Sequence, residues 1–73
     1  MKFPSRETIA KLRESYKKGM RVELMSMDDP YTKLRPGDKG TIDCVDDAGG
    51  IHINWDNGST LAAIWGEDII KLI

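Results

Sequence analysis

The sequence predicts a mainly β domain, a small five-stranded barrel with one N-terminal α-helix. Apolar residues recur at helical spacing in the first part of the chain, and the period switches to two at Met20. Turn signals rich in glycine and proline then divide the rest into short apolar runs. With 73 residues, the chain has the length of one domain, 1–73, with the helix over 5–18 and the barrel over 20–73.

The helix is predicted from its cap and its apolar stripe. Ser5 is suited to cap the first turn, and Ile9, Leu12 and Tyr16 recur at spacings of three and four. Gly19 supplies a residue that tolerates the left-handed conformation in which many helices end. We therefore expect an amphipathic helix that is stabilised by packing against the rest of the domain.

Five segments have the alternation or the short apolar runs of strands, and these are residues 20–27, 40–45, 51–55, 60–64 and 69–73. The pair Asn57-Gly58 predicts a tight type I′ hairpin, in which both central residues have positive φ. So small a flat sheet would leave its edges and one face uncovered. Closure into a barrel is therefore expected.

Four blocks of the sequence are distinctive: RVEL at 21–24, MDDP at 27–30, PGDKGTI at 36–42 and IHINWDNGS at 51–59. Together with the opening FPSRE, they resemble an uncharacterised family that is catalogued as a domain of unknown function. That family occurs in phages and conjugative elements of Firmicutes and Actinobacteria. The resemblance implies a bacterial accessory protein of a mobile genetic element and brings no established activity with it.

The same blocks are similar in layout to SH3-like barrels. A strand that begins Arg-Val, a Pro-Gly-x-x-Gly-Thr-Ile turn and a Trp-Asp-Asn-Gly hairpin follow one another as they do there. Such barrels include the mind-bomb-type domains of ubiquitin ligases, which bind short peptides, and the KOW-type domains of ribosomal and transcription proteins. This likeness implies the fold and leaves the ligand open.

The sequence predicts a cytoplasmic protein. No apolar run approaches the roughly 18 residues of a membrane span, and the opening residues lack the pattern of a secretory signal. The single cysteine, Cys44, agrees, since small secreted domains usually carry paired cysteines.

No catalytic residue, metal site or cofactor is predicted, and the chain is not expected to be an enzyme. Cys44 lies within a predicted strand and is expected to be a small buried thiol. His52 alternates with two isoleucines and is expected to point into water. The carboxylates lack the spacing of a calcium loop, and cysteine and histidine are too few for zinc.

The favoured function is binding of an unknown protein or peptide, because aromatic residues line the peptide grooves of SH3-like barrels. Tyr31, in a loop, and Trp65, at the end of a strand, are the candidate groove residues. Trp55 is a further candidate for the peptide site, but it shares a face with Ile51 and Ile53, which favours a core position with its indole N–H bonded to a loop carbonyl. The acidic turn Asp28-Asp29 completes the candidate peptide site.

The alternative function is nucleic-acid binding, because residues 1–19 carry a surplus of four positive charges and residues 40–73 a surplus of five negative ones. The candidate residues are Lys11, Arg13, Lys17, Lys18 and Arg21. The net charge of −1 argues against this alternative, since phosphate binding usually needs a basic domain. The apolar segment 69–73 could pair across chains, so a monomer or a weak homodimer is expected.

Overall fold

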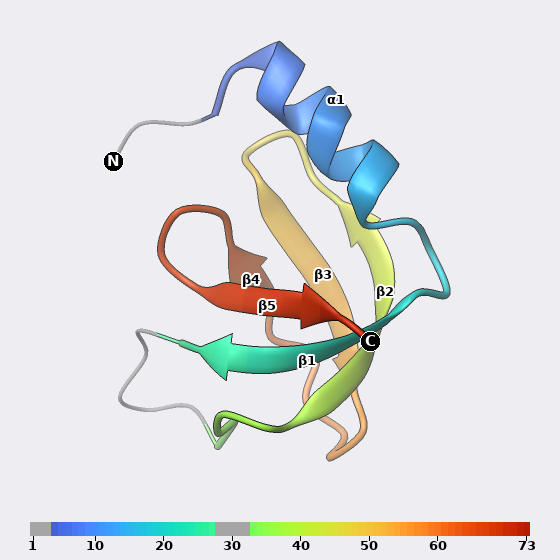
Figure 1. Cartoon of the computed structure of the whole chain (residues 1–73), viewed down its shortest axis with the longest axis vertical. Coiled ribbons are helices and arrows are strands. Elements are labelled where there is room, and N and C mark those ends of the chain that lie inside the picture. The colour runs from blue at the N-terminus through green and yellow to red at the C-terminus, as the bar shows by residue number, and fades with distance from the viewer. Residues whose placement is uncertain (1–3, 28–32) are drawn as a thin grey trace.

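The computed structural model describes residues 4–27 and 33–73. One helix precedes five strands (Figure 1). They are α1 (Arg6–Ser15), β1 (Arg21–Ser26), β2 (Lys39–Val45), β3 (Gly50–Trp55), β4 (Ala63–Ile64) and β5 (Ile69–Leu72). The predicted mainly β class is confirmed.

Helix α1 begins as the sequence predicts. Ser5 has an extended backbone, and its hydroxyl oxygen accepts a hydrogen bond from the Thr8 N–H at 3.2 Å. Ile9 and Leu12 are buried and face the sheet. The cap and the apolar stripe therefore fix both the start of the helix and the side that packs.

The end of the helix differs from the prediction. The helix stops at Ser15, and Tyr16 follows it as the C-cap, with its N–H donating to the Leu12 carbonyl. Gly19 does have positive φ, +92°, but it lies in the next turn, which the Met20 N–H closes on the Lys17 carbonyl. The glycine shapes the entry into β1 and does not end the helix.

The strands form one antiparallel sheet in the order β4-β3-β2-β1-β5. The strands at its two edges are β4 and β5, and no ladder joins them within the described residues. The predicted closure into a barrel is therefore not present. The reason is the shortness of β4, which pairs with β3 only at Ala63 and Ile64 instead of over 60–64.

The core lies on the concave side of the sheet, under α1. Its members are the apolar residues that alternate along the strands and helix: Ile9, Leu12, Val22, Leu24, Leu34, Ile42, Val45, Ile51, Ile53, Trp55 and Ala63. Tyr16 and Ile70 are half-buried and pack against this core. Helix and sheet therefore share one hydrophobic cluster.

The predicted burial of Cys44 is wrong because of a β-bulge in β2. Ile42 pairs with Ile53, and the register then shifts so that Cys44 pairs with His52. The extra residue in β2 interrupts the alternation of faces. As a result Cys44 is exposed and not part of the core.

The turn after β3 also differs from the prediction. Only Gly58 has positive φ there, at +92°, and Asn57 does not. The Gly58 N–H donates to the Trp55 carbonyl at 3.0 Å, and the Trp55 N–H donates to the Ser59 carbonyl at 2.9 Å. This is a three-residue loop with a glycine bulge, so the predicted type I′ turn is wrong.

In the part of the chain that the structure describes, no helix combines the length and apolar character that a membrane span requires.

Candidate functional site

An apolar groove lies between α1 and the turn that joins β4 to β5. We call it the α1–β5 groove, and it encloses about 310 Å³. Its lining residues come from the helix, β3, the turn and β5, and they are Leu12, Tyr16, Ile51, Trp65, Gly66, Asp68, Ile69 and Ile70. Most of these side chains are apolar, so the groove is suited to hydrophobic side chains of a partner.

Trp65 is the largest exposed side chain of the groove. It follows β4 directly, and 46% of its surface is exposed. Its N–H donates to the Gly49 carbonyl at 3.1 Å, which anchors its backbone to the start of β3. Its role as a peptide-binding residue stays a prediction.

The turn beyond Trp65 is held by reciprocal hydrogen bonds. The Asp68 N–H donates to the Ile64 carbonyl at 2.9 Å, and the Ile64 N–H donates to the Asp68 carboxylate at 2.8 Å. The Glu67 N–H donates to the same carbonyl at 3.1 Å. These bonds fix the backbone on both sides of the indole and place a carboxylate in the groove.

Tyr16 forms part of the opposite wall, and the sequence reasoning did not select it as a functional residue. Its place in the apolar stripe of α1 predicted only a core contact. The groove is formed with residues 65–70, which are far away in sequence. No local signal could have shown that Tyr16 and Trp65 line one groove.

Of the other candidate peptide-binding residues, Trp55 lies elsewhere. It is 3% exposed, and its indole Nε1–H donates to the Leu61 carbonyl at 2.8 Å. The predicted core position and loop hydrogen bond are both confirmed. Tyr31, Asp28 and Asp29 lie outside the described residues.

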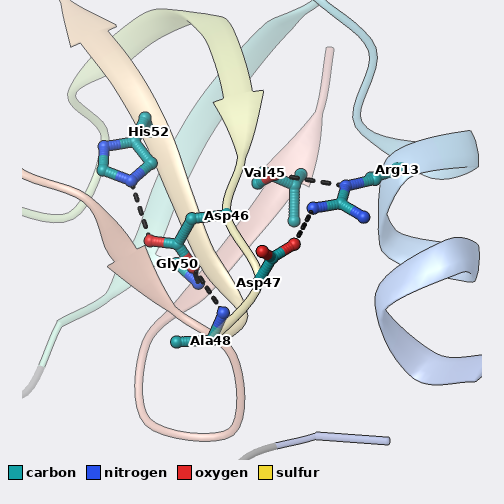
Figure 2. Close-up of polar contacts among 7 residues, drawn as sticks. All are labelled: Arg13, Val45, Asp46, Asp47, Ala48, Gly50 and His52. Carbon is teal, nitrogen blue, oxygen red and sulfur yellow. Dashed lines mark hydrogen bonds and ion pairs between the residues drawn. The ribbon is translucent and has the colours of Figure 1, made fainter. Parts of the chain in front are cut away.

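A polar cluster stabilises the turn between β2 and β3 (Figure 2). The Asp46 Oδ1 atom accepts hydrogen bonds from the Gly50 N–H at 2.7 Å and the Ala48 N–H at 2.9 Å. The other oxygen lies 2.9 Å from the His52 Nε2. The Gly50 hydrogen bond is the main cause that lowers the pKa of Asp46, with further contributions from His52 and Ala48.

His52 is half-exposed, as its alternation with isoleucines predicts. Cys44 is its register partner across β2 and β3, but among the described residues no hydrogen bond joins the thiol to the imidazole. The described residues also hold no group of three or more His, Cys, Asp or Glu side chains that could bind a metal ion. The contact between Asp46 and His52 stabilises the turn between β2 and β3.

The arginines among the nucleic-acid candidates form ion pairs with the acidic half of the chain. Arg13 donates from Nε to the Val45 carbonyl at 3.3 Å and from Nη2 to the Asp47 carboxylate at 2.6 Å, as Figure 2 shows. Arg21 donates to both carboxylate oxygens of Asp56, at 2.7 and 2.6 Å. These hydrogen bonds raise the pKa of Arg21 and lower that of Asp56.

The three lysines among these candidates are exposed. The helix predicted over 5–18 would hold Lys17 and Lys18 in its last turn. In the structure both residues follow the end of α1. Lys18 lies 3.9 Å from a carboxylate oxygen of Asp43, whereas the structure gives Lys11 and Lys17 no ion pair within its described part. Within residues 1–19, Arg13 and Lys18 therefore lie beside carboxylates from the last part of the chain.

Comparison with known families gives one match. The family model described as "Domain of unknown function (DUF4314)" matches residues 5–73, nearly the whole chain. Neither the curated proteins nor the solved structures give a match. The resemblance to a domain of unknown function is thereby confirmed, and the chain belongs to the DUF4314 family.

Proposed function

We propose that the chain is a small non-catalytic interaction module that binds a segment of another protein in the α1–β5 groove. The observation that carries this proposal is Trp65, which is 46% exposed and lines an apolar groove. Large aromatic residues at the centre of apolar pockets commonly contribute most of the binding energy of protein interfaces.

The walls of the groove support the proposal because they are parts of the folded core. Leu12 and Ile51 are buried, and the turn around Trp65 is fixed by its hydrogen bonds. A groove that exists before binding spares the partner the cost of ordering it.

We further propose that the sheet is an opened SH3-like fold. Its strand order supports this, because β1 lies between β2 and β5 and the last two strands occupy opposite edges. On the family resemblance, the partner is a protein of a bacterial mobile genetic element, such as a phage, and the encounter takes place in the cytoplasm.

Nucleic-acid binding has less support. Arg13 and Arg21 would have to release Asp47 and Asp56 before they could contact phosphates. A salt titration against random duplex and single-stranded DNA tests this alternative. Micromolar affinity that falls steeply with salt would favour it over a protein partner.

Selection from a random peptide library displayed on phage tests the proposed function. We expect enriched peptides that bind the protein and lose about tenfold or more in affinity to Trp65→Ala, as is typical of a tryptophan hot spot. Met25→Ala is the matched control, because Met25 is also exposed and does not line the groove. Thermal unfolding checks that both variants fold.

Two outcomes contradict the proposal. One is a selection that enriches no peptide. The other is a set of peptides that bind Trp65→Ala as tightly as the unchanged protein.

A further inference from the structure

Among the described residues, β5 pairs with β1 along one edge and with no strand along the other. The Ile73 N–H donates to the Arg21 carbonyl at 3.1 Å, which makes these residues a hydrogen-bonded pair of the antiparallel ladder. Such pairs alternate with pairs that exchange no hydrogen bond. Lys71 therefore bonds toward β1, whereas the N–H and C=O groups of Ile70 and Leu72 point away from β1.

The hydrogen bonds of Leu24 confirm that the backbone groups of Ile70 point away from β1. Leu24 pairs with Ile70 in the register of β1 and β5. Its N–H donates to the Asp38 carbonyl, and its carbonyl accepts from the Gly37 N–H, both at 2.8 Å. The backbone groups of Leu24 are thus used on the opposite side of β1, and those of Ile70 face the free edge of the sheet.

The free edge borders the α1–β5 groove. Ile69 and Ile70 belong to β5 and also line the groove. In Figure 1, β1 runs along one side of β5, and β4 and, farther away, α1 lie on its other side. In the part of the chain that the structure describes, backbone groups that no strand pairs and an apolar surface therefore lie next to each other.

We propose that the groove binds an extended segment that adds to β5 as a sixth strand. Its apolar side chains, at every second position, enter the groove, and a lysine or arginine lies beside the exposed Glu67. This inference rests on the proposed function, because it specifies the kind of partner that occupies the same groove. Strand addition of this kind obtains affinity from main-chain hydrogen bonds and specificity from alternate side chains.

The acidic turn supports a basic residue in the partner. Asp68 lines the groove, and Glu67 is exposed next to it in the same turn. The Ile64 N–H donates to the Asp68 carboxylate, which holds this group in place. A cation beside the exposed Glu67 would gain a charge-assisted hydrogen bond.

The free edge favours an extended partner over a helical one. A helix satisfies its own backbone groups, so a helix in the groove would cover the amides of Ile70 and Leu72 without pairing them. A buried N–H without an acceptor is costly. A strand pairs these groups instead.

The free edge also disfavours a second copy of this chain. Two β5 strands that pair antiparallel through the outward-facing groups of Ile70 and Leu72, with Ile70 opposite Leu72, place Lys71 opposite Lys71. Like charges directly opposite each other destabilise a strand pair. A partner segment with another side chain at that position avoids this repulsion.

Backbone N-methylation of a peptide from the library selection tests the proposal. A strand beside β5 uses only every second amide for pairing. We expect affinity to fall about tenfold or more at alternate positions and to change little at those between them. Loss at consecutive positions, or at none, would overturn strand addition and leave the Trp65-dependent binding of the proposed function intact.

Leu72→Pro tests the same edge on the protein. It removes an N–H that points away from β1, so we expect a folded sheet that binds the peptide about tenfold more weakly. Hydrogen exchange on the unchanged protein is the second readout, since the Ile70 and Leu72 amides are expected to exchange more slowly in the complex. Unchanged exchange of both amides would overturn the proposal. So would a dimer in sedimentation that saturating peptide does not dissociate.

Discussion

Arg21 of β1 and Asp56, which follows β3, are joined by two parallel hydrogen bonds of 2.7 and 2.6 Å. The same guanidinium donates to the Thr41 hydroxyl oxygen at 2.9 Å, so it also contacts β2. This fork-like geometry is specific to arginine. It connects three neighbouring strands on the side of the sheet away from the core.

The Arg21→Lys change tests the importance of this geometry. A lysine cannot reproduce the two parallel hydrogen bonds, so the pKa of Asp56 is expected to rise toward its ordinary value. An NMR titration of the Asp56 carboxyl measures the shift. Arg13→Lys is the control, because Arg13 pairs with Asp47. An Asp56 titration that Arg21→Lys leaves unmoved would contradict the assigned cause.

Asp46 predicts a dependence of stability on acid pH. Its pKa is lowered in the folded state from an ordinary value of 3.8, so its contribution to stability is present above that value and is lost as the pH falls through the folded pKa. The difference in urea midpoint between the unchanged protein and Asp46→Asn should therefore shrink below about pH 4. Glu14→Gln, at a side chain with no hydrogen bond in the described structure, is the control. A difference that stays constant down to pH 2 would count against this role.

Cys44 predicts the reactivity of an exposed thiol. A disulfide reagent should label the native protein without prior unfolding, because the bulge turns this residue outward. Cys44→Ser should change the free energy of unfolding by less than about 0.5 kcal/mol, as is usual at the surface. Labelling that occurs only in denaturant would show instead that the thiol is covered.

At Gly40, β2 and β3 approach so closely that we expect a larger side chain there to lower the free energy of unfolding. A Cβ atom at this position would lie 2.5 Å from Cγ2 of Ile53 and 3.0 Å from the Asn54 carbonyl oxygen. Gly40→Ala should therefore destabilise the fold by about 1–3 kcal/mol in urea unfolding. Ile53→Leu removes the Cγ2 branch, so the double variant should recover part of that loss. Strictly additive effects would mean that the two side chains do not meet.

The alternation of side chains predicted most of the fold. Ile51, Ile53 and Trp55 alternate with polar residues, and all three are in the core. The same rule failed at Cys44, because a bulge adds one residue to a strand and no turn residue marks it in the sequence. It also could not show that β4 would pair at only two residues and leave the sheet open.

Of the two aromatic residues that line the α1–β5 groove, only Trp65 could be selected from the sequence. Trp65 precedes a glycine at the end of an apolar run, which identified it as a residue outside the core. Tyr16, the C-cap of the helix, lines the other side of the groove. Their proximity depends on how α1 packs on the sheet, and local patterns carry no information about that packing.

The charge asymmetry of the sequence made the basic residues of the first segment candidates for nucleic-acid binding, and this stays a prediction. In the fold, Arg13 and Lys18 pair with Asp47 and Asp43. Charges that are separated in sequence can neutralise each other once the strands are in place.

The strand order has a consequence for synthesis on the ribosome. The first strand, β1, pairs with β5, which is translated after the other four strands of this sheet, and it separates β5 from those strands. Val22 and Leu24 are fully buried in the folded domain. Their neighbours Leu72 and Ile70 are translated only after most of the domain has been made. Until then the nascent chain exposes a hydrophobic edge. The domain should consequently complete its fold in one late step, after the segment 69–72 has left the exit tunnel.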